Sequence, residues 1–220
     1  MAKKTWLSWS SGKDSAWALH VLRGQTGVEV NGLFCTVNRE FDRVAMHAVR
    51  AELLRRQAER VGLPVRIIPI PNPCSNAEYD EIMSGFVAEA RREGIECFAF
   101  GDLYLEDIRR YREERLAGTG IAPIFPLWGR PTGELSRAMV NGGLRARITC
   151  VDPARLGAEF AGREYDQSFL GAIPETVDPC GENGEFHTFA FDGPMFAGPV
   201  DVVVGDTVSR DGFVFTDLLS

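Results

Sequence analysis

The alternation of strand-like and helix-like segments in its first half is what most constrains how this chain can fold. Short apolar runs rich in β-branched residues alternate with longer segments whose apolar side chains recur at helical spacing. This alternation is typical of βαβ units and predicts a parallel sheet. The expected strands cover residues 5–9, 28–37, 65–70 and 96–100, and the expected helices cover residues 15–22, 43–61, 76–93 and 106–117, with Asn76 as the cap of the third.

The pattern changes near residue 120, where prolines interrupt a short apolar piece. Pro123, Pro126 and Pro131 punctuate a run that we interpret as a fifth strand followed by a crossing into a second region. Beyond it we expect a helix over residues 133–141 and strands over residues 147–151, 200–204 and 213–215. The sequence therefore predicts an α/β domain over residues 1–128 and a smaller C-terminal α+β domain over residues 129–220.

The turn between the first strand and the first helix has the sequence SSGKDS. A strand-to-helix turn rich in Ser and Gly exposes successive backbone N–H groups, and the helix N-terminus adds a partial positive charge. Lys13 adds a cation, and the hydroxyl groups can donate to phosphate oxygens. Since open α/β sheets bind ligands beyond the carboxyl ends of their strands, we predict that a phosphate chain binds here, at Ser10, Ser11, Gly12, Lys13, Asp14 and Ser15.

Two common nucleotide motifs do not match this turn. A Walker P-loop needs Gly and Ser or Thr where this chain has Leu7 and Asp14, and the GxGxxG fingerprint is absent. The six residues resemble instead the PP-loop, SGGKDS, of the ATP pyrophosphatases. Ser11 stands where that motif commonly has Gly, which the backbone tolerates if φ stays negative there.

The carboxyl ends of two further strands supply more candidates at the same sheet edge. Thr36 is placed to contact adenine, although simple strand termination explains it equally well. Gly101 and Asp102 follow the fourth strand, where a carboxylate suits Mg²⁺ that bridges phosphates. A turn-forming Asp after Gly is the alternative, and we favour the metal-binding interpretation.

The helix at residues 106–117 carries charges of both signs and can be a solvated, ion-paired surface. Its periodicity adds that Arg112 and Arg115 share a face with Ile108 and Tyr111, the face expected to look inward. Arginines on such a face usually have an anionic partner, and guanidinium suits phosphate or carboxylate. We therefore prefer Arg112 and Arg115 over Arg110 as site residues.

The densest cluster of reactive side chains lies in the loop at residues 178–188, DPCGENGEFHT. Glu182, Glu185 and His187 are suited to proton transfer or metal binding, and a loop of this kind is often functional. The alternative is a tight turn that leads into a strand.

Composition and charge exclude several classes of protein. The 24 basic and 31 acidic residues give a net charge of −7, which argues against a broad nucleic-acid surface. No apolar run is long enough to span a membrane and no signal-peptide pattern is present, so we expect a cytoplasmic protein. Five scattered cysteines argue against disulfides and CxxC sites.

Several motifs together resemble the diphthine ammonia ligase family and its bacterial relatives. They are SSGKDS, FGDLYLEDIRRYREE, FPLW and VDPCGENGEFHTFAFDGPMF, and Met46-His47 is typical of the bacterial members. The resemblance implies a Rossmann-like (HUP-type) parallel sheet of order 3-2-1-4-5, the use of ATP and Mg²⁺, and amidation of a carboxylate through an acyl adenylate. It also implies that Lys13 stabilises the departing pyrophosphate and that the loop faces the acceptor or the amine through Gly181, Glu182, Asn183, Gly184, Glu185 and His187.

The leading hypothesis is therefore an AMP-forming ligase that uses ammonia and an acceptor carboxylate of unknown identity, with a homodimer as a possible assembly. An RNA-thiolating PP-loop enzyme is a second hypothesis, but such enzymes usually have paired cysteines and a basic surface. A nucleotide-binding sensor without activity is a third, and the Glu/His loop argues against it.

Overall fold

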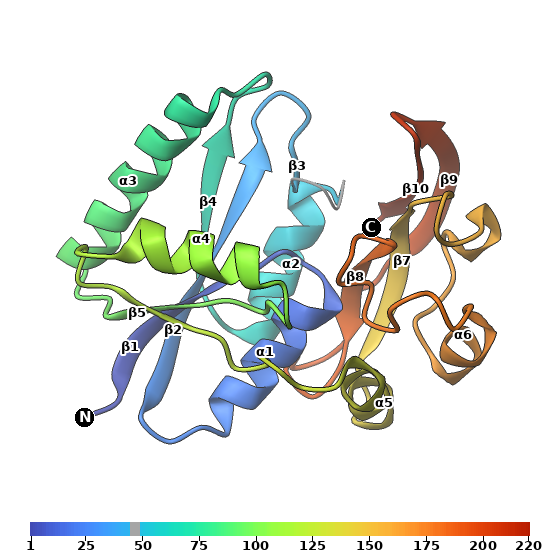
Figure 1. The fold of residues 1–220 in the computed structure, drawn as a ribbon, viewed down its shortest axis with the longest axis horizontal. Helices are drawn as coiled ribbons and strands as arrows, with labels where there is room; N and C mark the ends of the chain where they lie inside the picture. The colour runs from blue at the N-terminus through green and yellow to red at the C-terminus, as the bar shows by residue number, and fades with distance from the viewer. Residues whose placement is uncertain (45–48) are drawn as a thin grey trace.

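The computed structural model describes residues 1–44 and 49–220, which form two sheets with flanking helices (Figure 1). The first sheet contains the parallel strands β1 (Lys3–Ser8), β2 (Val28–Asn38), β4 (Val65–Ile70), β5 (Cys97–Ala99) and β6 (Ala122–Ile124). They pair in the order β4-β2-β1-β5-β6, which confirms the predicted order 3-2-1-4-5 for parallel strands. A short strand, β3 (Arg43–Val44), pairs antiparallel with the end of β2.

Two apolar layers cover the two faces of this sheet. Because successive side chains of a strand point to opposite faces, neighbours in β1 and β2 pack into different clusters. Leu7 and Leu33 pack with α1 (Lys13–Arg23) and α2 (Ala51–Val61). Trp6 and Phe34 pack in the other cluster, with Phe86 of α3 (Asn76–Arg92). The helix α4 (Glu106–Leu116) follows β5 and contributes Leu116 to this second layer.

The second sheet is antiparallel and belongs to the C-terminal part of the chain. Its order is β8 (Phe186–Asp192), β7 (Arg145–Val151), β10 (Phe213–Leu219) and β9 (Val203–Arg210). The helices α5 (Thr132–Asn141) and α6 (Gln167–Ala172) and a 3-10 turn at Ala158–Phe160 accompany it. Figure 1 shows β8 as the strand of the C-terminal sheet nearest α1, with which it is in contact, so the phosphate turn faces this sheet.

The structure corrects two predictions of local structure. The second helix begins at Ala51, not at residue 43, because Arg43–Val44 pairs with β2. The cap of α3 is Ser75 and not Asn76. The Ser75 hydroxyl accepts from the Glu78 N–H and the Glu78 carboxylate accepts from the Ser75 N–H, which is a capping box. Met46 and His47 lie outside the described residues. Within residues 1–44 and 49–220, no helix combines the length and apolarity needed to cross a membrane.

Candidate functional site

The predicted phosphate turn lies where β1 ends, at Ser8, and α1 begins, at Lys13. Gly12 precedes the helix in an extended conformation, and no side chain caps the helix from this position. The Ser15 hydroxyl donates to the Gly12 carbonyl at 3.0 Å and lies 3.3 Å from the Ser10 hydroxyl. The Lys13 N–H donates to the Thr188 hydroxyl of β8 at 3.0 Å, so a side chain of the C-terminal sheet meets the first N–H of the helix. The partial positive charge of the helix N-terminus is suited to an anion.

Ser11 adopts a φ of +66°, so the expectation that φ stays negative there is wrong. A left-handed conformation costs a residue with a side chain about 1–2 kcal/mol, and tertiary contacts hold it here. The Ser11 carbonyl accepts from the Ala190 N–H of β8 and from the side-chain amide of Gln57, both at 2.9 Å. Ser11 itself is fully buried. The positive φ also explains why Gly suits this position of the motif.

Gln57 is a fully buried polar side chain on α2 that the sequence analysis did not single out. Its Nε2 donates to the Ser11 carbonyl at 2.9 Å and to the Ala190 carbonyl at 2.6 Å, while its Oε1 accepts from Trp9 Nε1 at 2.8 Å. Both amide protons and the carbonyl are therefore used, as a buried amide requires. Gln57 joins the end of β1, the phosphate turn and β8 through one side chain.

Lys13 lies almost completely buried beneath the loop at residues 178–188. Its ammonium group donates to the Asp14 carboxylate at 2.8 Å and to the Cys180 carbonyl, and the rings of Tyr165 and Phe186 lie 5.6 and 5.4 Å away. Burial alone would lower the pKa of Lys13, but the Asp14 carboxylate together with Cys180 and Glu182 outweighs burial, and the pKa is raised. Lys13 is thus a cation held between the two regions.

A polar cavity of about 240 Å³ lies over the phosphate turn. The N-terminal region contributes Ser10, Lys13, Asp14 and Ser15, and the loop at residues 178–188 closes it from the opposite side. Gly101 lets the end of β5 lie close to the start of α1, because a Cβ there would lie 3.0 Å from the Asp14 backbone. The predicted residues that line the cavity are Ser10, Lys13, Asp14, Ser15, Gly101, Asp102, Arg112, Gly181, Glu182, Gly184 and His187.

Asp102, the predicted Mg²⁺ ligand, makes an ion pair with Arg112. The Arg112 guanidinium donates to the two carboxylate oxygens at 2.5 and 3.1 Å and lies 4.3 Å from the Phe100 ring centroid. Across the described residues no cluster of three or more metal-ligating side chains is formed. Asp14 also lines the cavity; its Oδ2 accepts from Lys13, and its Oδ1 is buried without a hydrogen-bond partner among the described residues.

The three loop residues proposed for proton transfer differ in position. Glu182 lines the cavity and accepts from the Leu103 N–H at 2.8 Å, and burial raises the pKa of its carboxyl to about 7. His187 also lines the cavity, and burial followed by the Lys13 charge lowers the pKa of its imidazole to about 4. Glu182 is therefore the group of the cavity whose proton is exchanged near neutral pH.

Glu185 has a different environment from Glu182. It is buried below the loop, where its Oε1 accepts from the Asp178 N–H at 3.2 Å and from the Asn183 amide at 3.1 Å. Asn183 is exposed, and neither residue lines the cavity. Their hydrogen bonds hold the loop in shape, so the structure places Glu185 and Asn183 behind the cavity wall.

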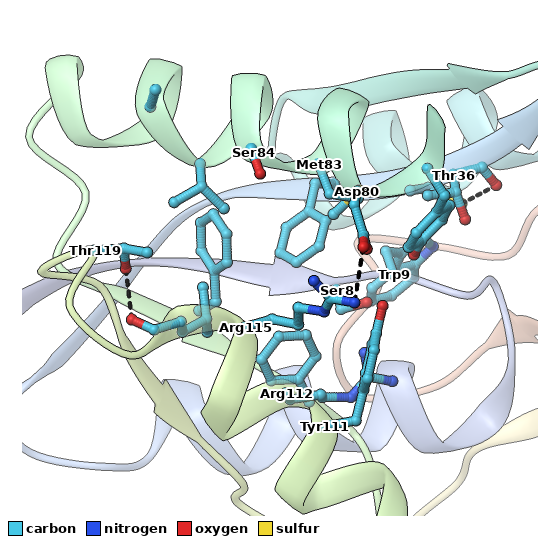
Figure 2. A pocket seen from close by; sticks show the side chains of 18 of the residues that line it. Ser8, Trp9, Thr36, Asp80, Met83, Ser84, Tyr111, Arg112, Arg115 and Thr119 are labelled. Carbon is cyan, nitrogen blue, oxygen red and sulfur yellow. Dashed lines mark hydrogen bonds and ion pairs between the residues drawn. The ribbon is translucent and has the colours of Figure 1, made fainter. Parts of the chain in front are cut away.

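A larger cleft of about 540 Å³ opens between α3, α4 and the first sheet (Figure 2). It shares Ser8, Ser10, Phe100 and Arg112 with the polar cavity, so the two spaces are adjacent. Thr36 lines the cleft and not the cavity. Arg115 also lines it, where it pairs with Asp80 of α3 at 2.8 Å.

The face of α4 predicted to look inward therefore borders an open cleft. Ile108 and Tyr111 are 41% and 40% exposed, so this face is not buried as expected. Arg112 and Arg115 do have anionic partners, as predicted for this face. The structure shows that these partners are Asp102 and Asp80 respectively. Arg110 instead pairs with Asp107 on the exposed side of the helix.

The described cysteines are free thiols, and three of them have a strongly raised pKa. Burial raises the pKa of Cys35, Cys150 and Cys180 to about 12. A thiol with such a pKa remains protonated and is a poor nucleophile at neutral pH. The thiol chemistry of an RNA-thiolating enzyme therefore has no support in these three residues.

Comparison with known proteins gives matches over most of the chain. The family model of the diphthamide synthase N-terminal domain matches residues 3–121, and that of the diphthamide synthase C-terminal domain matches residues 132–214. The diphthine–ammonia ligase of Bos taurus is 26% identical over 94% of this chain and 85% of that protein. Those of Homo sapiens and Danio rerio are each 27% identical over 82% of this chain, and over 70% and 73% of their own length.

Proposed function

The chain belongs to the diphthamide synthase family, and on that premise we propose that it is an ATP-dependent ligase that forms an amide from a carboxylate and ammonia. The relatives it matches are named diphthine–ammonia ligases. The observation that carries the proposal is the polar cavity, which is lined by a buried lysine at a helix N-terminus on one side and by Glu182 of the C-terminal loop on the other. One wall suits phosphate and the other suits the proton transfers of amide formation.

The proposed reaction has two steps, and the cavity residues divide between them. In the first, a carboxylate oxygen of the acceptor attacks the α-phosphorus of ATP and pyrophosphate leaves. Ser10, Ser15 and the N–H groups of the turn would bind the phosphates, and the Lys13 cation would stabilise the negative charge that develops on pyrophosphate. Lys13 is held by Asp14 and the Cys180 carbonyl, so its position depends on the loop.

In the second step the nitrogen of ammonia attacks the carbonyl carbon of the acyl adenylate, and AMP leaves with the C–O bonding electrons. Ammonium must first lose a proton, and the ionised Glu182 carboxylate is placed to accept it. Gly181 and Gly184 line the same wall and leave room for the amine. Glu185, Asn183 and His187 would act on the shape and polarity of this wall, since the first two hydrogen-bond within the loop and the imidazole is neutral.

Mg²⁺ is part of the proposal. Mg²⁺ is usually bound by one or two carboxylates together with substrate phosphates. The residues that would hold it here are Asp14, whose Oδ1 has no hydrogen-bond partner within the described part of the chain, and Asp102, since both carboxylates line the phosphate cavity. Such an ion would neutralise phosphate charge in a protein whose net charge is −7. A cytoplasmic location, a homodimer and the boundary of the two domains at residue 128 also remain proposals.

A nucleotide-binding sensor is the second candidate function. Thr36 and the larger cleft would serve a sensor as well as an enzyme. The loop with Glu182 distinguishes the two, because binding alone does not need a carboxyl group with a pKa of about 7 in the phosphate cavity.

Turnover separates these functions. The protein would be incubated with ATP, Mg²⁺, ammonium and a pool of carboxylates, while pyrophosphate and AMP are followed. Carboxylate-dependent formation of both products supports the ligase. Formation of ADP and phosphate, or tight ATP binding without turnover under every acceptor tried, would contradict it. Lys13→Ala is expected to abolish turnover and weaken ATP binding.

A further inference from the structure

Asp178 is the first residue of the loop at residues 178–188, and its carboxylate holds the turn that carries Glu182. Asp178 Oδ1 accepts from the Cys180 N–H at 3.3 Å, and Oδ2 accepts from the Glu182 N–H at 2.9 Å. The Asp178 carbonyl also accepts from the Gly181 N–H at 2.8 Å. Aspartate often stabilises a turn in this way, because its short side chain reaches main-chain N–H groups a few residues further on. The turn at residues 178–182 is therefore formed around one carboxylate.

The glycines of the loop make this turn depend on its hydrogen bonds. Gly181 and Gly184 have φ values of +67° and +85°. Glycine adopts many other conformations at little cost, so the main chain beside Glu182 has little rigidity of its own. The Gly184 N–H donates to the Gly181 carbonyl at 3.1 Å, and the Asp178 carboxylate supplies the bond to Glu182 itself. Without that carboxylate, the main chain at Glu182 can adopt other conformations.

The segment that follows β5 holds both carboxylates from the other side. The Leu103 N–H donates to Glu182 Oε1 at 2.8 Å. The hydroxyl of the next residue, Tyr104, donates to Asp178 Oδ2 at 3.3 Å. Leu103 is fully buried and its carbonyl accepts from the Gly129 N–H at 2.8 Å, so this segment is a firm support. Glu182 is thus held at its carboxylate by Leu103 and at its N–H by Asp178, and Tyr104 holds Asp178 in turn.

Cys180, at the start of the turn, has partners that do not depend on Asp178. Its thiol donates to the Thr132 carbonyl at 3.5 Å, and its carbonyl accepts from the Lys13 ammonium. The Glu182 N–H has the Asp178 carboxylate as its acceptor. Loss of this carboxylate should therefore displace Glu182 more than it displaces Lys13.

The charged groups that face Glu182 come from two other elements. Lys13 and Asp14 begin α1, and Asp102 follows β5. Burial is the largest cause of the raised pKa of Glu182; the two aspartates add to it, and the Leu103 N–H and Lys13 oppose it. A Glu182 carboxyl that left this position for solvent would titrate closer to the ordinary pKa of Glu.

We propose that Asp178 is a positioning residue for Glu182 and that the Tyr104 hydroxyl keeps Asp178 in place. The inference rests on the proposed ligase function, in which Glu182 accepts a proton from ammonium. Neither Asp178 nor Tyr104 lines the phosphate cavity, so both act through Glu182. Their contribution is to keep its carboxylate at the wall of the cavity where the amine would react.

The test measures the titration of Glu182 and needs no acceptor. Carbon NMR of the side-chain carboxyl groups follows Glu182 in the full chain, without nucleotide or Mg²⁺, and Glu182→Gln identifies the resonance by its loss. In the unchanged protein the titration midpoint is expected at about pH 7. Asp178→Ala should lower it by at least about 1 pH unit, and Tyr104→Phe by about 0.3–1 pH unit, both toward the ordinary pKa of Glu.

Two variants serve as controls. Tyr104→Phe separates position from charge, since it removes a hydroxyl and leaves every charge in place. Asp166→Ala is matched to Asp178→Ala, because the Asp166 carboxylate also accepts from a main-chain N–H, that of Phe169 at 2.8 Å, at the start of α6. It should lower the temperature of unfolding and move the Glu182 titration by less than about 0.2 pH unit. Asp178→Asn, which keeps one acceptor oxygen, repeats the test if Asp178→Ala does not fold.

The proposal is overturned if Asp178→Ala leaves the Glu182 titration within about 0.3 pH unit of the unchanged protein. It is also overturned if Tyr104→Phe has no effect, because the lost charge alone then explains Asp178→Ala, or if Glu182 of the unchanged protein titrates at the ordinary pKa of Glu. With an acceptor that supports turnover, Asp178→Ala should lower kcat/KM for ammonium at least about tenfold and change KM for ATP less than about twofold. A titration that follows the proposal without pyrophosphate release from any acceptor would reject the ligase function and leave the positioning of Glu182 in place.

Discussion

Gln57→Leu is the substitution that most directly tests how the phosphate turn is held. Leucine is of similar size but offers no partner to Trp9 Nε1, which is buried at the end of β1. Leaving that donor unsatisfied costs about 1–3 kcal/mol, and the two hydrogen bonds to the carbonyls of Ser11 and Ala190 contribute about 0.5–1.5 kcal/mol each. We therefore expect the free energy of unfolding to fall by about 2–6 kcal/mol.

Thermal and urea unfolding measure this loss. In a chain of this length each kcal/mol shifts the midpoint by about 2–4 °C, so the expected decrease is at least about 4 °C. Gln167→Leu is the control, because its amide makes an exposed bond to Asn141 and should change stability by no more than about 0.5 kcal/mol.

The consequence for binding follows from the Ser11 backbone. Its positive φ is unfavourable by itself, and without the Gln57 amide only the Ala190 N–H remains on the Ser11 carbonyl. We expect Gln57→Leu to weaken ATP binding in the folded protein at temperatures well below the midpoint. A second substitution, Gln57→Glu, keeps the acceptor for Trp9 but places a carboxylate against two carbonyls, so its stability should recover as pH falls and the carboxyl becomes a donor. The reasoning is refuted if Gln57→Leu unfolds within about 1 °C of the original protein and binds ATP equally well.

Three further predictions concern titration and charge. Burial raises the pKa of Glu182 to about 7 in the folded protein. The protonated carboxyl therefore stabilises the fold fully at a pH below the ordinary pKa of Glu, and this stabilisation is lost as the pH rises through 7. Glu182→Gln should remove this fall in the free energy of unfolding. At a fixed ammonium concentration, turnover should rise through pH 7 as the Glu182 carboxyl ionises, and Glu182→Gln should lose this rise. Partial burial alone would raise the pKa of Asp217, but hydrogen bonds from Arg50 and Arg43 lower it to about 2. Asp217→Asn should therefore lower the free energy of unfolding by at most about 1 kcal/mol above pH 4 and leave it unchanged below pH 2. Urea unfolding at each pH measures this.

The parallel sheet and its strand order could be predicted because each element of the first half carries its own local pattern. β4 was predicted at its observed bounds, since the apolar run of residues 65–70 is closed by prolines. The second helix was predicted eight residues too long, because the strand at Arg43–Val44 exists only by pairing with Val37 and Asn38. Periodicity within a segment does not report a partner that lies elsewhere in the chain.

The candidate site likewise contains residues that the local sequence predicts and residues that it does not. The phosphate turn and the loop at residues 178–188 were found because small and reactive residues are concentrated within a few positions. Gln57 was missed because a single glutamine in an amphipathic helix carries no local signal; its function depends on Trp9, Ser11 and Ala190, which are remote from it in sequence. Glu182 and Glu185 could not be separated from sequence, since their difference is burial and the direction in which each side chain points.

The phosphate site is therefore a property of both regions, although its motif belongs to one. The carbonyl of Ser11 and the N–H of Lys13 bond to Ala190 and Thr188 of β8, and the Lys13 ammonium bonds to the Cys180 carbonyl. Without the C-terminal region, the Ser11 carbonyl would keep the Gln57 amide but lose the Ala190 N–H, and Lys13 would lose the Cys180 carbonyl and the cover of the loop. A chain with net charge −7 then attracts ATP only through a small positive pocket that exists when both regions are folded together. Nucleotide binding and the closure of the Glu182 loop over Lys13 are for this reason two aspects of the same folded arrangement.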